Sequence, residues 1–178
     1  MIDAAARSLS TPQQIALVIL RTLIGWHFLY EGFYKWMLPA WGSDGKPIGK
    51  WSSAGYLNAA AGPLAGLFHR LVETGWVAWI DRAIVVGLIL IGLSLLLGAL
   101  TKAGCWGAIF LLALFYLSWP PLQGLPQQGS EGTYLLVNKN LIELVAVVVL
   151  LVFRTEWIAG LDLLWKRRKQ HSRLVIAE

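Results

Sequence analysis

The chain has 178 residues, of which 57% are hydrophobic and only 14% are charged. Soluble domains contain about 45–50% apolar and about 25% charged residues, so this composition excludes an ordinary soluble domain and indicates an integral membrane protein. The formal net charge of +5 does not indicate nucleic-acid binding, because basic residues cluster in residues 166–173, just beyond the last apolar segment.

The first predicted membrane span covers about residues 14–36, with Ser10 or Thr11 as its N-cap and Pro12 near its first turn. Arg7 before this apolar run imitates a secretory signal. No small-residue cleavage site follows, so we expect an uncleaved span.

The long segment between the first two spans, residues 38–80, contains an apolar repeat at helical spacing. The repeat consists of Leu64, Leu67, Phe68, Leu71 and Val72. Because Pro63 stands where a helix begins, this pattern predicts a short amphipathic helix that lies on the membrane and caps the outer end of the bundle.

The second span is predicted at about residues 81–100 and the third at about residues 103–119. A turn at residues 101–102 makes them antiparallel neighbours. The fourth span is predicted at about residues 134–153, after a segment rich in Gly, Pro and Gln. The sequence therefore predicts one domain, residues 1–178, with an all-α, four-transmembrane-helix bundle and an outer amphipathic helix.

The basic tail, residues 166–178, places the C-terminus in the cytoplasm, because cytoplasmic loops carry an excess of Lys and Arg. An even number of spans then places the N-terminus on the same side. We therefore expect a multi-pass protein of the cell (inner) membrane with the lipid bilayer as its surroundings. A small extracytoplasmic partner subunit and a homo-oligomer both stay open.

Ionisable groups inside a span are costly unless they are paired or reach the interface, so they mark candidate sites. One face of the first span combines such groups with small residues. Its members are Arg21, Gly25, Phe28, Gly32 and Lys35, with His27 and Glu31 on its flank. We expect the glycines to bring a neighbouring helix close and Arg21 to face the bundle interior. In the alternative, Arg21 and Lys35 only extend to the two interfaces.

A second set of polar residues lies at the same depth as Glu31 and Lys35, because the spans are antiparallel. It consists of Asp81 and Arg82 on the second span and Lys139, Asn140 and Glu143 on the fourth. We expect this mixture near the outer side of the bundle, where it can hold an anion or a quinone head group and move protons. Lys139 can reach Glu143 one turn later. In the alternative, the charges only neutralise one another and fix the helix register.

The sequence offers no pattern for a resident cofactor. A second axial histidine for His27 is missing, since His69 lies in the loop and His171 in the tail, so haem is not expected. Cys105 is the only cysteine, which excludes a cysteine cage for a cluster. We expect no haem, flavin or metal, and any redox carrier must be borrowed, with quinone as co-substrate.

Three segments carry a family resemblance. Residues 21–35 have the pattern R-x3-G-x2-F-x3-G-x2-K, and residues 87–102 and 138–140 supply a glycine-bearing second span with a basic turn and the start of the fourth span. These segments resemble the DoxX/DoxD family of small four-helix membrane proteins, which includes the membrane subunit of thiosulfate:quinone oxidoreductase. One departure is Leu88, where family members often carry Glu. The role of that carboxylate is then absent or moved to Asp81, Glu31 or Glu143.

The resemblance implies a membrane subunit of a sulfur-compound (thiosulfate-like):quinone oxidoreductase, in which the anion approaches from the outer face and electrons pass to membrane quinone. Glu31 and Glu143 would then exchange protons, with His27 and Asp81 in support. Binding of the anion or the quinone would fall to Arg21, Lys35, Arg82, Lys139 and Asn140. The alternatives are a non-catalytic anchor or scaffold for an extracytoplasmic redox partner, and a small-solute or lipid carrier.

Overall fold

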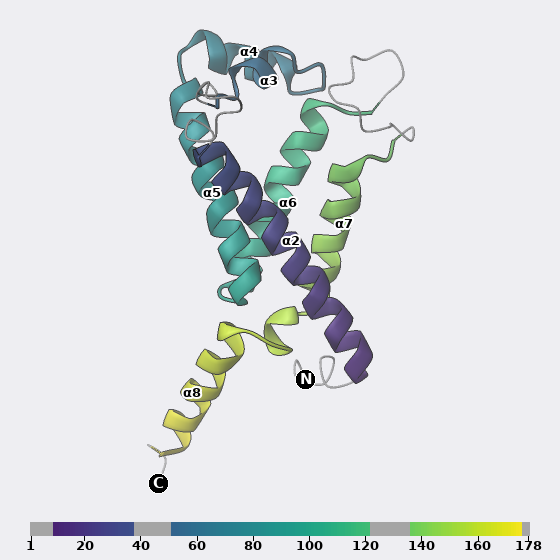
Figure 1. Cartoon of the computed structure of the whole chain (residues 1–178), viewed down its shortest axis with the longest axis vertical. Coiled ribbons are helices and arrows are strands. Elements are labelled where there is room, and N and C mark those ends of the chain that lie inside the picture. Colours follow the sequence, from purple (N-terminus) through teal and green to yellow (C-terminus); the bar gives the residue numbers. More distant parts are fainter. Residues whose placement is uncertain (1–8, 38–50, 122–135, 176–178) are drawn as a thin grey trace, which may run out of the picture.

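The structure is a computed structural model that describes residues 9–37, 51–121 and 136–175, the last seven of them in their backbone only. All regular elements in these ranges are helices (Figure 1). In chain order they are α2 (Thr11–Met37), α3 (Ala54–Asn58), α4 (Ala65–Glu73), α5 (Val77–Leu97), α6 (Thr101–Ser118), α7 (Lys139–Val152), the 3₁₀ turn η2 (Thr155–Trp157) and α8 (Leu161–Val175). The predictions for Arg7 and for the expected start of the fourth span at residue 134 lie outside the described residues.

Three of the described helices, α2, α5 and α6, are long and apolar enough to cross a membrane, judged by length and composition. Their outward faces expose large apolar side chains such as Trp26, Leu90 and Phe110. A water-soluble protein rarely leaves so much apolar surface uncovered. The chain is therefore a membrane protein whose described regular elements are all helices, as its composition predicts. The helix α7 is shorter, with 14 residues.

The helix α2 begins as the sequence predicts. Ser10 N–H donates to Gln13 Oε1 (2.8 Å), and Pro12 lies in the first turn. The helix then packs along α5, where glycines on both helices bring the two backbones together. A Cβ atom added at Gly92 would lie 2.4 Å from Leu29 N, and one added at Gly25 would lie 2.8 Å from Leu96 N. The expected close contact at the glycine-bearing face of α2 is confirmed.

One apolar core joins α2, α5, α6 and α7. Its fully or nearly buried members come from all four helices: Ile24, Phe28, Leu88, Ile91, Leu95, Cys105, Ala108, Leu112, Val147 and Leu150. The helix α7 packs mainly against α6 and crosses α2 (Figure 1). The short helices α3 and α4 lie at one end of the bundle, and the start of α2 and the helix α8 lie at the other end (Figure 1).

The helix α4 corresponds to the predicted amphipathic segment. Phe68 is buried with Leu57 of α3, and Leu71 packs against them, whereas Leu67 remains 54% exposed. A second contact fixes this layer to α5, since Asp81 Oδ1 accepts hydrogen bonds from Ser53 N–H (2.8 Å) and Ser53 Oγ–H (2.5 Å). The two short helices are therefore attached to the end of the bundle.

The boundaries of α5 and α6 differ from the predicted ones. The helix α5 begins at Val77, two residues after Gly75 with its positive φ of 77°, so Asp81 lies inside the helix rather than at its start. It ends at Leu97, because Gly98 adopts the left-handed conformation (φ 61°) that favours glycine. Residues 101–102 therefore form the first turn of α6 and not the connecting turn.

A cap from a distant part of the chain starts α6. Leu100 N–H and Thr101 N–H donate to the two carboxylate oxygens of Asp162, each at 2.8 Å. The backbones of the two segments are also in contact, since Asp162 N–H donates to Gly98 O (2.8 Å). A Cβ atom added at Gly98 would lie only 2.8 Å from the Cα of Gly160. These hydrogen bonds attach the start of α8 to the α5–α6 turn.

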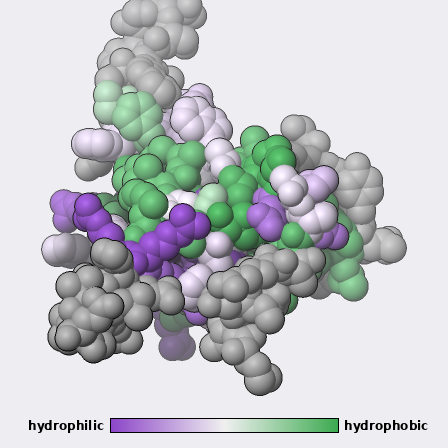
Figure 2. Space-filling model, turned by 90° about the horizontal axis from the view of Figure 1, so that it is seen from below, coloured by the Kyte–Doolittle hydropathy of each residue, from purple (hydrophilic) through white to green (hydrophobic). Residues whose placement is uncertain are grey.

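The same end of the molecule contains the other buried charges. Glu156 of η2 is only 2% exposed, and Lys102 Nζ lies 3.6 Å from its Oε1. Seen from this end, hydrophilic side chains gather beside broad hydrophobic areas rather than mixing with them (Figure 2). The basic residues of α8 include Lys166, whose ammonium nitrogen lies 3.7 Å from the centre of the Trp157 ring.

Candidate functional site

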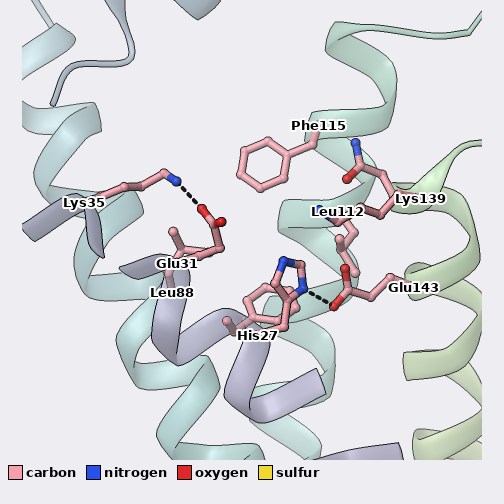
Figure 3. Close-up of a pocket in the computed structure, with 10 residues that line it drawn as sticks. His27, Glu31, Lys35, Leu88, Leu112, Phe115, Lys139 and Glu143 are labelled. Atoms are coloured by element: carbon pink, nitrogen blue, oxygen red, sulfur yellow. Dashed lines mark hydrogen bonds and ion pairs between the residues drawn. The ribbon is translucent and has the colours of Figure 1, made fainter. Parts of the chain in front are cut away.

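A cavity of about 180 Å³ lies between α2, α6 and α7, and we call it the polar cavity (Figure 3). Its polar lining consists of His27, Glu31, Lys35, Lys139, Asn140 and Glu143. Its apolar lining consists of Phe28, Leu88, Leu112 and Phe115. The cavity thus brings together Glu31, Lys35, Lys139, Asn140 and Glu143, which the sequence predicts at one depth on the first and fourth spans.

The closest polar contact in this cavity joins α2 to α7. His27 Nδ1 lies 2.6 Å from Glu143 Oε1. The Glu143 side chain is 11% exposed and that of His27 is 36% exposed. The sequence also predicts a contact of Lys139 with Glu143, and both side chains line this cavity. An imidazole and a carboxylate at this distance can hold a proton between them and pass it on.

An ion pair within α2 forms the opposite wall. Lys35 Nζ contacts Glu31 Oε2 one helical turn away, and the same ammonium nitrogen lies 5.4 Å from the centre of the Trp51 ring. In Figure 3 Lys35 and Glu31 lie on one side of the cavity and Lys139 and Glu143 on the other, with His27 of α2 reaching toward Glu143. A ligand in the cavity would therefore meet a carboxylate from each of two helices.

The start of α7 supplies the third wall. Asn138 caps this helix, since its side-chain oxygen accepts a hydrogen bond from Leu141 N–H (3.0 Å), and α7 begins at Lys139. Lys139 and Asn140 then lie in the first turn, where the helix also presents the positive end of its dipole. Donors and positive charge at this wall favour an anion or a carbonyl oxygen.

Leu88 of α5 lies in the lining of the polar cavity and is nearly buried. The carboxylate that the family resemblance leads one to expect here is replaced by an apolar side chain. The carboxylates that do face the cavity are Glu31 and Glu143. If proton exchange takes place in this cavity, these residues and His27 are the groups positioned for it.

Asp81 and Arg82 do not face the polar cavity. They line a different cavity of about 820 Å³ on the other side of the α2–α5 contact, which shares Lys35 with the polar cavity. The Asp81 carboxylate accepts the two hydrogen bonds from Ser53. The prediction that they share one site with Glu143 is therefore wrong, because residues at equal depth on α5 can point to different faces.

Arg21 lies far from both cavities. It is 2% exposed, and its Nη1 donates to Thr155 O (3.0 Å) and Ala159 O (2.8 Å). Along α2 it stands about 21 Å from Lys35 at 1.5 Å per residue. The prediction that Arg21 faces the interior is confirmed, but its assignment to the substrate site is corrected, since its guanidinium holds the η2 segment.

Two features of the lining and the buried interior were not predicted. Phe115 closes the polar cavity from α6, and Glu156 is a buried carboxylate at the other end. Phe115 could have been found by extending the depth comparison to apolar residues of the third span. Nothing in the sequence around Glu156 signals burial, because it follows the last span and precedes the basic tail.

Within the described part of the chain, no three His, Cys, Asp or Glu side chains lie together as a metal site would require. The comparisons with known proteins found no matching family model, no matching curated protein and no matching solved structure. The resemblance to the DoxX/DoxD family therefore stays a prediction from the sequence.

Proposed function

We propose that this protein is the membrane subunit of a sulfur-compound:quinone oxidoreductase and that the polar cavity receives the head group of a membrane quinone. One observation carries the proposal: the His27–Glu143 contact of 2.6 Å opens onto the same cavity as Lys35 and Lys139. Proton donors and positive charges around one small space are what the reduction of a quinone needs.

Reduction of a quinone to a quinol takes up two electrons and two protons. As electrons arrive, negative charge develops on the two carbonyl oxygens. Lys35, Lys139 and Asn140 are placed to donate hydrogen bonds to these oxygens and so stabilise that charge. The His27–Glu143 pair and Glu31 are placed to deliver the protons.

The size and the apolar lining of the polar cavity support a ring-sized ligand. Its volume of about 180 Å³ is below the roughly 300–1,000 Å³ of sites that enclose drug-sized molecules. Phe28, Leu112 and Phe115 offer apolar contacts to the faces of a ring. A long apolar quinone tail would have to lie outside the cavity, between the helices or in lipid.

The electron donor in this proposal is a sulfur anion such as thiosulfate, as the resemblance to the DoxX/DoxD family implies. Joining two thiosulfate ions through a new sulfur–sulfur bond gives tetrathionate and releases two electrons. One quinone accepts these electrons together with two protons, so the reaction balances. Lys35 and Lys139 would attract the anion as well as the quinone oxygens.

In the proposed membrane arrangement, α7 is the fourth span and both termini lie in the cytoplasm of a cell with this protein in its inner membrane. The basic residues of α8 support this orientation. The 14 residues of α7 rise about 21 Å, and the exposed Leu136, Val137 and Phe153 at its ends extend the apolar length. The helix α4 would then lie on the outer surface.

The test is quinone reduction by the purified full-length protein in lipid nanodiscs. A short-tailed quinone and thiosulfate are added, and the loss of oxidised quinone is followed by absorbance, with quinone binding measured separately by tryptophan fluorescence. We expect both binding and thiosulfate-dependent reduction. Binding without reduction would favour a scaffold that presents quinone to a partner subunit, and no binding would contradict the proposal.

A further inference from the structure

The cavity of about 820 Å³ lies in the crevice between α2 and α5, and we call it the α2–α5 groove. We propose that it binds an anionic phospholipid, with the phosphate held by Arg82 and Lys35 and an acyl chain lying along α5. This inference goes beyond the proposed function, because it concerns a different ligand in a different cavity. It does not depend on quinone chemistry.

The groove changes from charged to apolar along the direction of α5. Its charged end carries Arg82 and Asp81, whereas Val85, Val86 and Ile89 form its lining farther along the helix. These apolar residues lie about 5–10 Å beyond Arg82 at 1.5 Å per residue. A phospholipid has the same order of a charged head followed by an apolar chain, so its two parts match the two parts of the groove.

Arg82 has the charge and the freedom to bind a phosphate. Its guanidinium lies 5.1 Å from the centre of the Trp79 ring, and no described carboxylate lies within 4.0 Å of it in an ion pair. The neighbouring Asp81 carboxylate is instead engaged by Ser53. A planar guanidinium can donate parallel hydrogen bonds to two phosphate oxygens.

Lys35 provides a second positive group at the same end of the groove. Its ammonium contacts Glu31 on one side and lies near the Trp51 ring on the other, and Trp51 also lines the groove. Together with Trp36 and Trp79, this ring belongs to a group of tryptophans around the charged end. Tryptophans gather at the level of lipid head groups in membrane proteins, which is where a phosphate would be.

The surroundings of Arg82 favour an anionic lipid over a zwitterionic one. Glu31 is paired with Lys35, and the Asp81 carboxylate is oriented by its two hydrogen bonds from Ser53. The Arg82 guanidinium lies beside the Trp79 ring and forms no ion pair with a described carboxylate. A lipid with a net negative charge would neutralise this guanidinium. A lipid whose own ammonium group neutralises its phosphate gains less from it.

The experiment is native mass spectrometry of the full-length protein in detergent, titrated with phosphatidylglycerol or with phosphatidylcholine of identical acyl chains. We expect phosphatidylglycerol to bind about tenfold more tightly, because a charge-assisted bidentate contact is among the stronger hydrogen bonds. Arg82→Gln should remove this preference. Arg70→Gln is the matched control, since Arg70 is an exposed arginine of α4 that does not line the groove.

A second variant tests the apolar part of the site. Val86→Trp places a large side chain in the groove and should weaken binding of both lipids, while the melting temperature reports whether the variant folds. The proposal is overturned if phosphatidylcholine binds as well as phosphatidylglycerol, or if Arg82→Gln binds like the parent. It also fails if Val86→Trp leaves binding unchanged, if inorganic phosphate alone binds as tightly, or if a quinone analogue displaces the lipid competitively.

Discussion

His27 of α2 and Glu143 of α7 meet at 2.6 Å although 116 residues separate them in the chain. This contact ties α2 to α7 beside the polar cavity. Six residues earlier on α2, Arg21 ties the same helix to the segment that follows α7. The helix α2 is therefore attached to the C-terminal part of the chain at two points, about 9 Å apart along its axis at 1.5 Å per residue.

Glu143→Gln should keep the hydrogen bond to His27 but remove the group that exchanges a proton. We expect the rate of thiosulfate-dependent quinone reduction to fall about 100-fold, the lower end of what a positioned acid or base contributes. The melting temperature should change little. The matched control is Glu73→Gln, because Glu73 is an exposed carboxylate of α4 that does not line the cavity. Full activity in Glu143→Gln would remove this residue from the proposed mechanism.

Arg21→Leu should destabilise the protein without weakening quinone binding directly. The substitution leaves Thr155 O and Ala159 O without their donor, and an unsatisfied buried acceptor costs about 1–3 kcal/mol. We expect a lower melting temperature and an unchanged quinone dissociation constant for the folded fraction. Arg21→Lys should be intermediate, since an ammonium cannot match the planar guanidinium. A variant with Leu that melts at or above the parent temperature would show that the buried charge is not stabilising.

Acid should weaken the attachment of α8 through Asp162. Burial raises the pKa of this carboxyl, but hydrogen bonds from Thr101 and Leu100 and the charge of Lys166 outweigh burial and hold the pKa below its ordinary value of 3.8. A carboxyl with a depressed folded pKa stabilises the fold above its unfolded pKa, and this stability is lost as the pH falls through the folded pKa. We expect the melting temperature to decline below about pH 4.

The matched variant for this pH dependence is Asp162→Asn. It should melt at a lower temperature than the parent at pH 6, because a neutral amide is a weaker acceptor for the two N–H groups. Its melting temperature should also decline less between pH 6 and pH 3. Parallel pH profiles for the two proteins would show that another group causes the acid effect.

Gly92→Ala and Gly87→Ala compare two glycines of α5 in different surroundings. A Cβ at Gly92 would lie 2.4 Å from Leu29 N, so the two helices must move apart, whereas a Cβ at Gly87 meets only Leu111 Cδ1 at 3.9 Å. We expect Gly92→Ala to lower the melting temperature clearly. Gly87→Ala should leave it unchanged or raise it, since alanine favours a helix by up to about 1 kcal/mol. Equal effects of the two substitutions would contradict the glycine-mediated contact.

Depth along the helices predicted that the polar residues of α2 and α7 converge, but not the cavity that they line. Antiparallel helices place residues near the end of α2 level with residues at the start of α7, and the lining of the cavity contains both sets. The same reasoning failed for Asp81 and Arg82. The depth of a residue in the membrane follows from its position along the helix. The face of α5 that meets α2 depends instead on contacts such as that of Gly92 with Leu29, which the sequence pattern does not specify.

The helix boundaries show a similar division. Ser10 and Pro12 signal the start of α2 locally, and the structure agrees. The start of α6 depends on Asp162, whose carboxylate comes from 61 residues later. Local sequence therefore does not reveal this cap, and the prediction of a connecting turn at residues 101–102 is wrong. The predicted role of Arg21 failed for the same reason, because its acceptors lie more than 130 residues away.

The distant cap of α6 also sets an order for assembly of the protein during synthesis. When α6 leaves the ribosome, the carboxylate that will accept from Leu100 N–H and Thr101 N–H has not yet been made. These two N–H groups must donate to water until Asp162 has been synthesised. Arg21 likewise lacks its acceptors until Thr155 and Ala159 have been added to the chain. Contacts between such distant residues form late, because bringing them together restricts the long chain segment between them and so costs conformational entropy. A nascent chain that stops before residue 162 would therefore lack the carboxylate that caps α6.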